Sequence, residues 1–415
     1  MRSKIKKISL IKRLWLVLAV LGPGLITASA DNDAPGIATY SMAGSRYGYN
    51  FLWLLVVVTF GEVFIQEMAA RLGAVTGKGT ADLIREKFGV KITLFAMVCL
   101  LVANLGTTIA EFAGIAAGAE LLGVSRYLVV PVTAIVIGFL VMGGSYKNVE
   151  KLLLVLCLSA IAYVISAFIL KPDWGDVLHS AVTPQFLLEP TYIIAVLATI
   201  GTTITPWGIF YMQASVVDKG VDEQDYGLTR VDVVFGAIWG NIISAFIIIC
   251  TGATLFIHGI QVEEAEQAAM ALAPLAGDWA KLLFATGLVG ASILAAMVLP
   301  LSTVYAITEA FGWERGLDQK RRDAPIFYGL YIAVIAASSI FVLIPGLPLF
   351  KIMLLSQSMN AILLPILLVL VLILANDKAI MGKWKNKKFQ NIFSILLTVM
   401  ISAISLALFV LQFTD

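Results

Sequence analysis

The chain has 415 residues, of which 60% are hydrophobic and 13% charged, and its mean hydropathy is +0.92. This composition excludes an ordinary water-soluble protein. The formal net charge of +2 gives no sign of a nucleic-acid-binding surface. We therefore expect a polytopic membrane protein.

Apolar runs close to the roughly 20 residues needed to cross a bilayer recur along the whole chain. We expect them to be helices, because an open sheet edge leaves hydrogen-bonding groups unsatisfied in hydrocarbon. Eleven spans are predicted, at about residues 14–45, 50–72, 92–122, 126–145, 150–170, 190–216, 232–257, 280–311, 325–344, 348–375 and 390–412. The predicted fold class is an all-α membrane protein with a single transmembrane domain over residues 1–415.

The basic residues are distributed unevenly between the two sides that these spans define. Of the 29 Lys and Arg residues, 24 lie in or beside the N-terminal tail and alternate connections between spans. Because cytoplasmic segments carry an excess of Lys and Arg, we expect the N-terminus inside the cell and the C-terminus outside. The predicted location is the plasma membrane.

Two of the predicted spans are interrupted by polar residues, proline and glycine. The first span breaks at Asp33–Gly36, just after Asp31 and Asn32, and the sixth span breaks between Thr202 and Gly208. Proline and glycine free backbone groups that protein or a water-filled cavity must then satisfy. The alternative is that both breaks are simple kinks without a binding role, since kinks are common in membrane helices. Carboxylates at one of two position-matched breaks favour a binding site instead.

The two breaks begin consecutive sets of five spans, about residues 14–170 and 190–375. Since five is odd, the second set enters the membrane from the opposite side. This is the pattern of LeuT-like transporters, in which inverted repeats place unwound helices 1 and 6 around a central site. The span at 390–412 lies outside the repeat, and we expect it to be peripheral.

Several stretches resemble the NRAMP family of divalent-metal transporters. The first span reads "GPGLITASADNDAPGIATYSMAGSRYGYNFLWLL", and Gln66–Gly89 reads "QEMAARLGAVTGKGTADLIREKFG". "AEFAGIAAGAELL" in the third span and "LLSQSMNAILLPI" in the tenth also fit. The resemblance covers essentially the whole chain. It implies a transporter rather than an enzyme, with divalent metal ions as cargo, the bilayer as its surroundings and no cofactor. We expect a monomer with no obligate protein partner.

The chain departs from the family at the positions that bind metal. The family's Asp-Pro-Gly-Asn motif falls on residues 33–36, so the aspartate is kept as Asp33 while Gly36 replaces the asparagine. The family's Met-Pro-His falls on residues 205–207, giving Thr205 and Trp207. In the third span, Glu111 is kept but its partner aspartate is Thr108.

These replacements resemble the branch of NRAMP-related magnesium transporters, which carry Mg²⁺ and Mn²⁺ without proton coupling. The residue chemistry agrees, because a soft thioether favours Mn²⁺ and later metals, whereas a threonine hydroxyl is a hard ligand. Mg²⁺ is usually held by one or two carboxylates and retained water. We therefore expect an enlarged, oxygen-lined pocket for a partly hydrated ion.

Proton coupling requires titratable groups along the pathway. The two histidines, His179 and His258, fall in predicted outer loops, and Trp207 cannot carry a proton. The predicted mechanism is uniport by alternating access. Two alternatives stay open: a proton-coupled Mn²⁺/Fe²⁺ symporter and, on the same scaffold, an amino-acid or amine carrier.

The expected site residues follow from this alignment. We expect Asp33 to be the main ligand, Thr202 to offer its backbone carbonyl, and Thr205 to act through its hydroxyl. The full predicted metal set is Asp33, Gly36, Thr202, Thr205, Ala30 and Gln357, and the predicted pathway set is Asp31, Glu111 and Trp207.

Several of these assignments stay open between two roles. Gln357 either joins the site or makes a polar contact in the bundle. Asp31 either lines the vestibule or forms a local helix-end bond, and Glu111 either lines the pathway or pairs within the bundle. Trp207 either gates the site or fills the space left by the histidine. Glu62 in the second span gives no specific indication.

Overall fold

The computed structural model describes residues 27, 30–143, 161–187, 189–317 and 319–411. Within these ranges the regular elements are all helical. The membrane-crossing and half-membrane helices are α3 (Ala34–Tyr47), α4 (Leu52–Thr76), α5 (Thr80–Leu121), α6 (Arg126–Gly143), α8 (Ile161–Leu170), α10 (Pro190–Thr203), α11 (Pro206–Asp218), α12 (Tyr226–Thr254), α15 (Ala280–Phe311), α16 (Pro325–Val342), α17 (Leu349–Asn376) and α19 (Lys388–Leu411). Shorter helices connect them: α9 (Trp174–Val182), α13 (Ala265–Met270), α14 (Ala273–Ala276) and α18 (Lys378–Met381).

The described helices match the predicted spans. Nine segments in the described ranges are long and apolar enough to cross a membrane, counting α3 with α4 and α10 with α11 as single segments. The short helix α8 covers the end of the predicted fifth span. The first half of the predicted first span and the start of the fifth lie outside the described residues.

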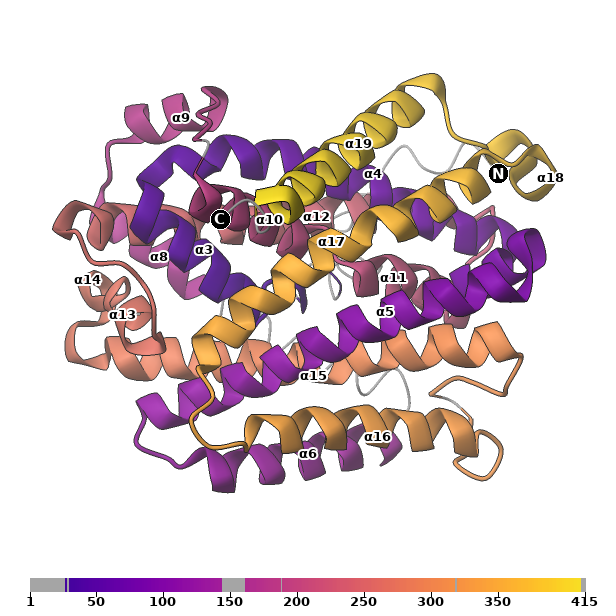
Figure 1. Cartoon of the computed structure of the whole chain (residues 1–415), viewed down its shortest axis with the longest axis horizontal. Helices are drawn as coiled ribbons and strands as arrows, with labels where there is room; N and C mark the ends of the chain where they lie inside the picture. Colours follow the sequence, from indigo (N-terminus) through magenta and orange to yellow (C-terminus); the bar gives the residue numbers. More distant parts are fainter. Residues whose placement is uncertain (1–26, 28–29, 144–160, 188, 318, 412–415) are drawn as a thin grey trace, which may run out of the picture.

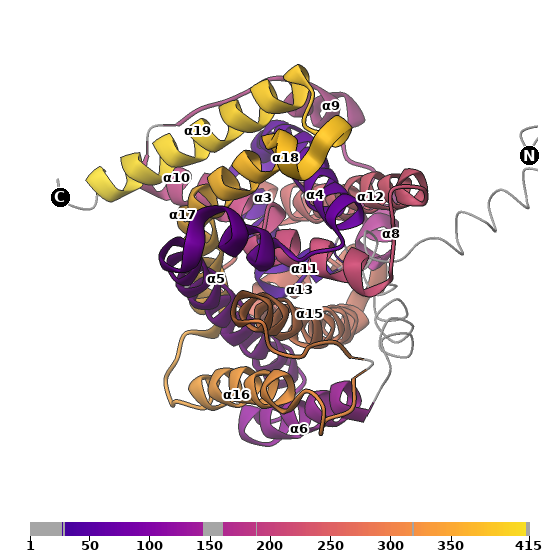
Figure 2. The ribbon, with the colours of Figure 1, turned by 90° about the vertical axis from the view of Figure 1, so that its right-hand side faces the viewer.

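Broken helices form the centre of the molecule, and long continuous helices surround them (Figure 1). The short helices α3, α10 and α11 contact α4, α5, α12, α15 and α17. The end-on view places α6 and α16 together at one edge, where they pack on α5 and α15 (Figure 2). The last helix, α19, lies against α17, α10 and α4 on the outside, as expected for a span outside the repeat.

One helix is longer than the hydropathy pattern predicts. Helix α5 begins at Thr80, twelve residues before the expected start of the third span, and turns at Gly89. Gly89 has φ +77°, a conformation that glycine adopts at little cost. Residues 80–88 thus form a separate helical segment before the turn. This segment is too polar to be predicted as part of the span from hydropathy.

Candidate functional site

The first break is a helix start built by Asp33. Its backbone is extended, and its Oδ1 accepts a hydrogen bond of 2.7 Å from the N–H of Gly36, which caps α3. Pro35 lies in the first helical turn, where a missing N–H costs nothing. The sequence therefore starts a helix inside the predicted first span with a carboxylate at its N-terminus, the end of the helix dipole that favours negative charge.

The second break has the same construction with a neutral residue. Helix α10 ends at Thr203, and Thr205 caps α11 by accepting 3.2 Å from the N–H of Gly208. Pro206 is the first residue of α11. The two breaks meet, because the Thr205 hydroxyl donates to Asp31 Oδ1 at 3.0 Å.

Gly36 lies in close contact with both breaks. A Cβ at this position would come within 2.9 Å of the Asp31 carbonyl oxygen and 3.2 Å of Thr202 Oγ1. The first carbon of any side chain at this position would therefore meet atoms of both breaks. In this structure α3 and α10 approach each other closely at the glycine, and the enlarged pocket expected from Gly36 stays a prediction.

Oxygen atoms without hydrogen-bond partners surround Asp33. Among the described residues, Asp33 Oδ2, Thr202 Oγ1 and Glu111 Oε1 are buried without a donor or acceptor. The other Glu111 oxygen accepts 3.4 Å from the N–H of Ala34, and the Glu111 carboxyl lies close enough to that of Asp33 to interact with it. Asp33 itself is 1% exposed. Such unpaired, buried oxygens are costly unless a cation or protons satisfy them.

The other predicted site residues are placed as follows. Ala30 is buried in the helical turn before the break. Gln357 makes its hydrogen bonds within α17, donating to Ser356 Oγ and accepting from Asn360. These bonds correspond to the expected alternative of a polar contact in the bundle. The hydroxyl of Thr108 bonds to its own helix, at the carbonyl of Asn104.

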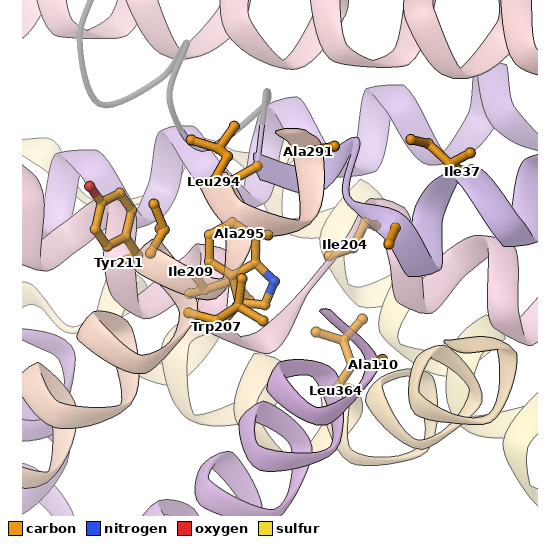
Figure 3. Packing of buried hydrophobic residues seen from close by; sticks show 14 of the residues in the cluster. Ile37, Ala110, Ile204, Trp207, Ile209, Tyr211, Ala291, Leu294, Ala295 and Leu364 are labelled. Carbon is orange, nitrogen blue, oxygen red and sulfur yellow. The ribbon is translucent and has the colours of Figure 1, made fainter. Parts of the chain in front are cut away.

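Trp207 fills space beside the second break. Its ring is fully buried in the large apolar core, with Ile204 and Ile209 nearby in the chain (Figure 3). Ser302 of α15 donates to its carbonyl oxygen at 2.8 Å. In this conformation Trp207 occupies the core as a packing residue, which corresponds to the space-filling alternative.

The structure adds a group of residues that sequence reasoning passed over. Gln66 Nε2 donates to Asp31 Oδ2 at 3.3 Å and to Glu62 Oε1 at 2.7 Å, and Asn241 of α12 donates to the other Glu62 oxygen. Glu62 and Gln66 are four residues apart on α4, so both face the break. That spacing was the available signal, but it does not by itself show which way the helix is turned.

No group of three His, Cys, Asp or Glu side chains forms a metal cluster within the described ranges. A bound ion would instead depend on one or two carboxylates with hydroxyl, carbonyl and water oxygens. A separate cavity of about 740 Å³ lies at the other end of α3, on the predicted outer side, between Arg46, Glu120, Lys351 and the acidic loop Glu263–Glu266.

Comparison with known proteins supports the same fold. The family model described as "Natural resistance-associated macrophage protein-like" (Nramp) matches residues 24–411. A divalent metal cation transporter MntH of Aeromonas hydrophila is 28% identical over 378 residues, covering 89% of this chain and 90% of that protein.

Solved structures agree. An Eremococcus coleocola manganese transporter superposes with a TM-score of 0.72 at 20% identity, covering 97% of this chain and 88% of the other. Mhp1, a nucleobase-cation-symport-1 family transporter, has a TM-score of 0.60 at 12% identity, covering 94% and 91%. The predicted LeuT-like fold with broken helices is confirmed by these neighbours and by the breaks themselves.

Proposed function

This chain belongs to the Nramp family, and we propose that it imports divalent cations, Mg²⁺ and Mn²⁺, across the plasma membrane without proton coupling. The observation that carries the proposal is Asp33, a buried carboxylate at the broken helix with one oxygen unpaired. We assign Asp33 as the main ligand and place Thr202 and Thr205, from the second break, on the opposite side of the ion. The N-terminus is assigned to the cytoplasm on the distribution of basic residues.

The ligand types support a hard ion. The side chains at the two breaks offer carboxylate, hydroxyl and amide oxygens: Glu111 lies beside Asp33, and Thr205 and Gln66 bond to Asp31. Thr205 stands where the family has a methionine. Without thioether sulfur, the site loses its preference for softer transition metals over Mg²⁺. Mg²⁺ takes six oxygen ligands and keeps several waters. Since the protein offers few unpaired oxygens at Asp33, retained water completes the shell.

The driving force in this proposal is the ion gradient together with the membrane potential. The potential supplies about 2.3 kcal/mol per charge per 100 mV, or roughly 4.6 kcal/mol for a divalent cation. Both histidines of the chain are exposed, on α9 and on the short turn Phe256–His258, so the interior contains no imidazole. Uptake down this gradient does not require protons.

One observation favours a second candidate, a proton-coupled Mn²⁺ symporter. Glu111 lies beside Asp33, so the site contains two interacting carboxyls rather than one. Such a pair is able to hold a proton in one state and a cation in another. Proton coupling through Glu111 would then survive the loss of the family's histidine.

Uptake into liposomes distinguishes the two candidates. The full-length protein is reconstituted with a metal indicator and a pH dye inside, and Mg²⁺ or Mn²⁺ is added outside at a fixed potassium-diffusion potential. We expect influx of both ions, faster at inside-negative potential, with the lumenal pH unchanged. Absence of Mg²⁺ influx together with Mn²⁺-dependent acidification would favour the symporter.

A further inference from the structure

A second pair of buried carboxylates lies next to the candidate site. Asp31 is 7% exposed and Glu62 is 2% exposed. Their carboxyl groups are close enough to interact, and the amide of Gln66 donates to both. The remaining oxygens accept from Thr205 and Asn241. Every one of these donors is neutral.

The charge of this pair is not balanced by a basic side chain. The charged groups that act on Asp31 are Glu62 and Asp33, which are also acidic, and the ion pairs of the described residues do not include Asp31 or Glu62. One divalent ion at Asp33 and Glu111 would neutralise those two carboxylates, so Asp31 and Glu62 need protons or a second cation of their own. An unpaired charge at membrane depth is expensive.

Gln66 supplies an observation independent of the charges. The Gln66 side chain is 3% exposed, and its Oε1 has no hydrogen-bond partner among the described residues. The same amide already bridges the two carboxylates through its nitrogen. Rotation of the amide by half a turn would put Oε1 between them, where it would repel the carboxylates in an empty site but bind a cation in an occupied one.

We propose that Asp31 and Glu62, together with Gln66 Oε1, form a second binding site for a divalent cation. Two carboxylates match the charge of one such ion, and oxygen ligands suit Mg²⁺ or Mn²⁺. Because Asp31 precedes the break, this site lies on the predicted cytoplasmic side of Asp33. The ion binds there after it leaves the central site and before it reaches the cytoplasm. This role rests on the proposed transport function.

The test is the number of Mn²⁺ ions bound per chain, measured by equilibrium dialysis of the full-length protein in lipid nanodiscs. We expect two for the natural chain, one for Glu62→Gln, one for Asp33→Asn and none for the double variant. Glu62→Gln keeps the shape but accepts only one of the two hydrogen bonds that Gln66 and Asn241 donate to Glu62. Retention of its first Mn²⁺ shows that the variant is folded. One ion in the natural chain, or two in Glu62→Gln, overturns the proposal.

A gain-of-charge variant gives a second measurement. Asn241 contacts Glu62, so Asn241→Asp adds a third carboxylate to the second site and should tighten its Mn²⁺ affinity by about tenfold. An unchanged affinity would contradict the placement. The two hypotheses fail differently: no bound Mn²⁺ at all refutes the proposed function, whereas one ion that depends on Asp33 but not on Glu62 refutes the second site alone.

Discussion

The two helix breaks share one backbone construction but differ in charge. In each, a residue with an extended backbone caps the following half-helix by accepting from a glycine three residues later, and a proline occupies the first turn. Asp33 does this with one carboxylate oxygen and keeps the other unpaired. Thr205 uses its oxygen for Gly208 and its hydrogen for Asp31.

The difference shows how a repeated fold acquires an asymmetric site. Capping requires one acceptor oxygen, so threonine and aspartate serve equally well. The main ligand of a cation needs charge and an oxygen free to bind it, and of these two caps the aspartate provides both. Geometry is thus common to both halves, and the chemistry is concentrated at Asp33.

The largest effect is expected from Asp33→Asn, which keeps the cap and removes the charge. We expect Mn²⁺ affinity at the central site to fall about 100-fold, or roughly 2.8 kcal/mol at 1.4 kcal/mol per factor of ten. Calorimetric titration measures this loss, and Thr205→Ser, which also keeps a cap, serves as the matched control. Normal affinity in Asp33→Asn would mean that the first break does not hold the ion.

A smaller effect is expected when the two capped glycines are compared. In Gly36→Ala the new Cβ would meet the backbone oxygen of Asp31 at 2.9 Å, whereas in Gly208→Ala it would meet the Thr205 side chain at 2.7 Å. Because backbone yields less readily than a side chain, we expect Gly36→Ala to slow uptake by about tenfold and Gly208→Ala by about threefold. Initial rates in liposomes measure both, and equal losses would contradict the ranking.

Thr205→Met tests the ligand at the second break. A thioether should raise the Mn²⁺/Mg²⁺ uptake ratio by about fivefold, because soft ligands favour the transition metal. Gly36 is left unchanged in this test, since a Cβ there would already meet the Asp31 carbonyl oxygen at 2.9 Å. The ratio is measured by competition uptake with Thr205→Leu as the size-matched control, and the same ratio in both variants would count against the softness argument.

The smallest effect is expected for Glu111→Gln, measured as the change in lumenal pH during Mn²⁺ influx. If transport is uniport, Mn²⁺ influx leaves the pH dye unchanged in both the natural chain and this variant. Acidification in the natural chain that disappears in Glu111→Gln would identify Glu111 as the proton carrier and establish the second candidate function. The expected null result has an internal control in the Mn²⁺ influx recorded from the same vesicles.

The sequence predicts most of this fold, because hydropathy and the proline–glycine breaks are local signals. The breaks at Asp33 and Thr205 are where the pattern places them. What it misses depends on how helices are rotated and how closely they pack. The four-residue spacing of Glu62 and Gln66 puts them on one face of α4, but only the rotation of that helix brings them to Asp31. The tight contact at Gly36 likewise depends on where α10 lies.

The hydrogen bond between Thr205 and Asp31 has a consequence for movement. Each half of the sixth span closes its own backbone bonds, with Ile204 N–H on Ile200 and Ile209 N–H on Thr205. A change in the angle between α10 and α11 would therefore break neither set of bonds. The bond to Asp31 ties the start of α11 to the first break, while Ser302 bonds to Trp207 and Thr80 bonds to Gln213 farther along α11. An ion that drew Asp31 away from Thr205 would therefore remove one of the contacts that hold α11 in this position.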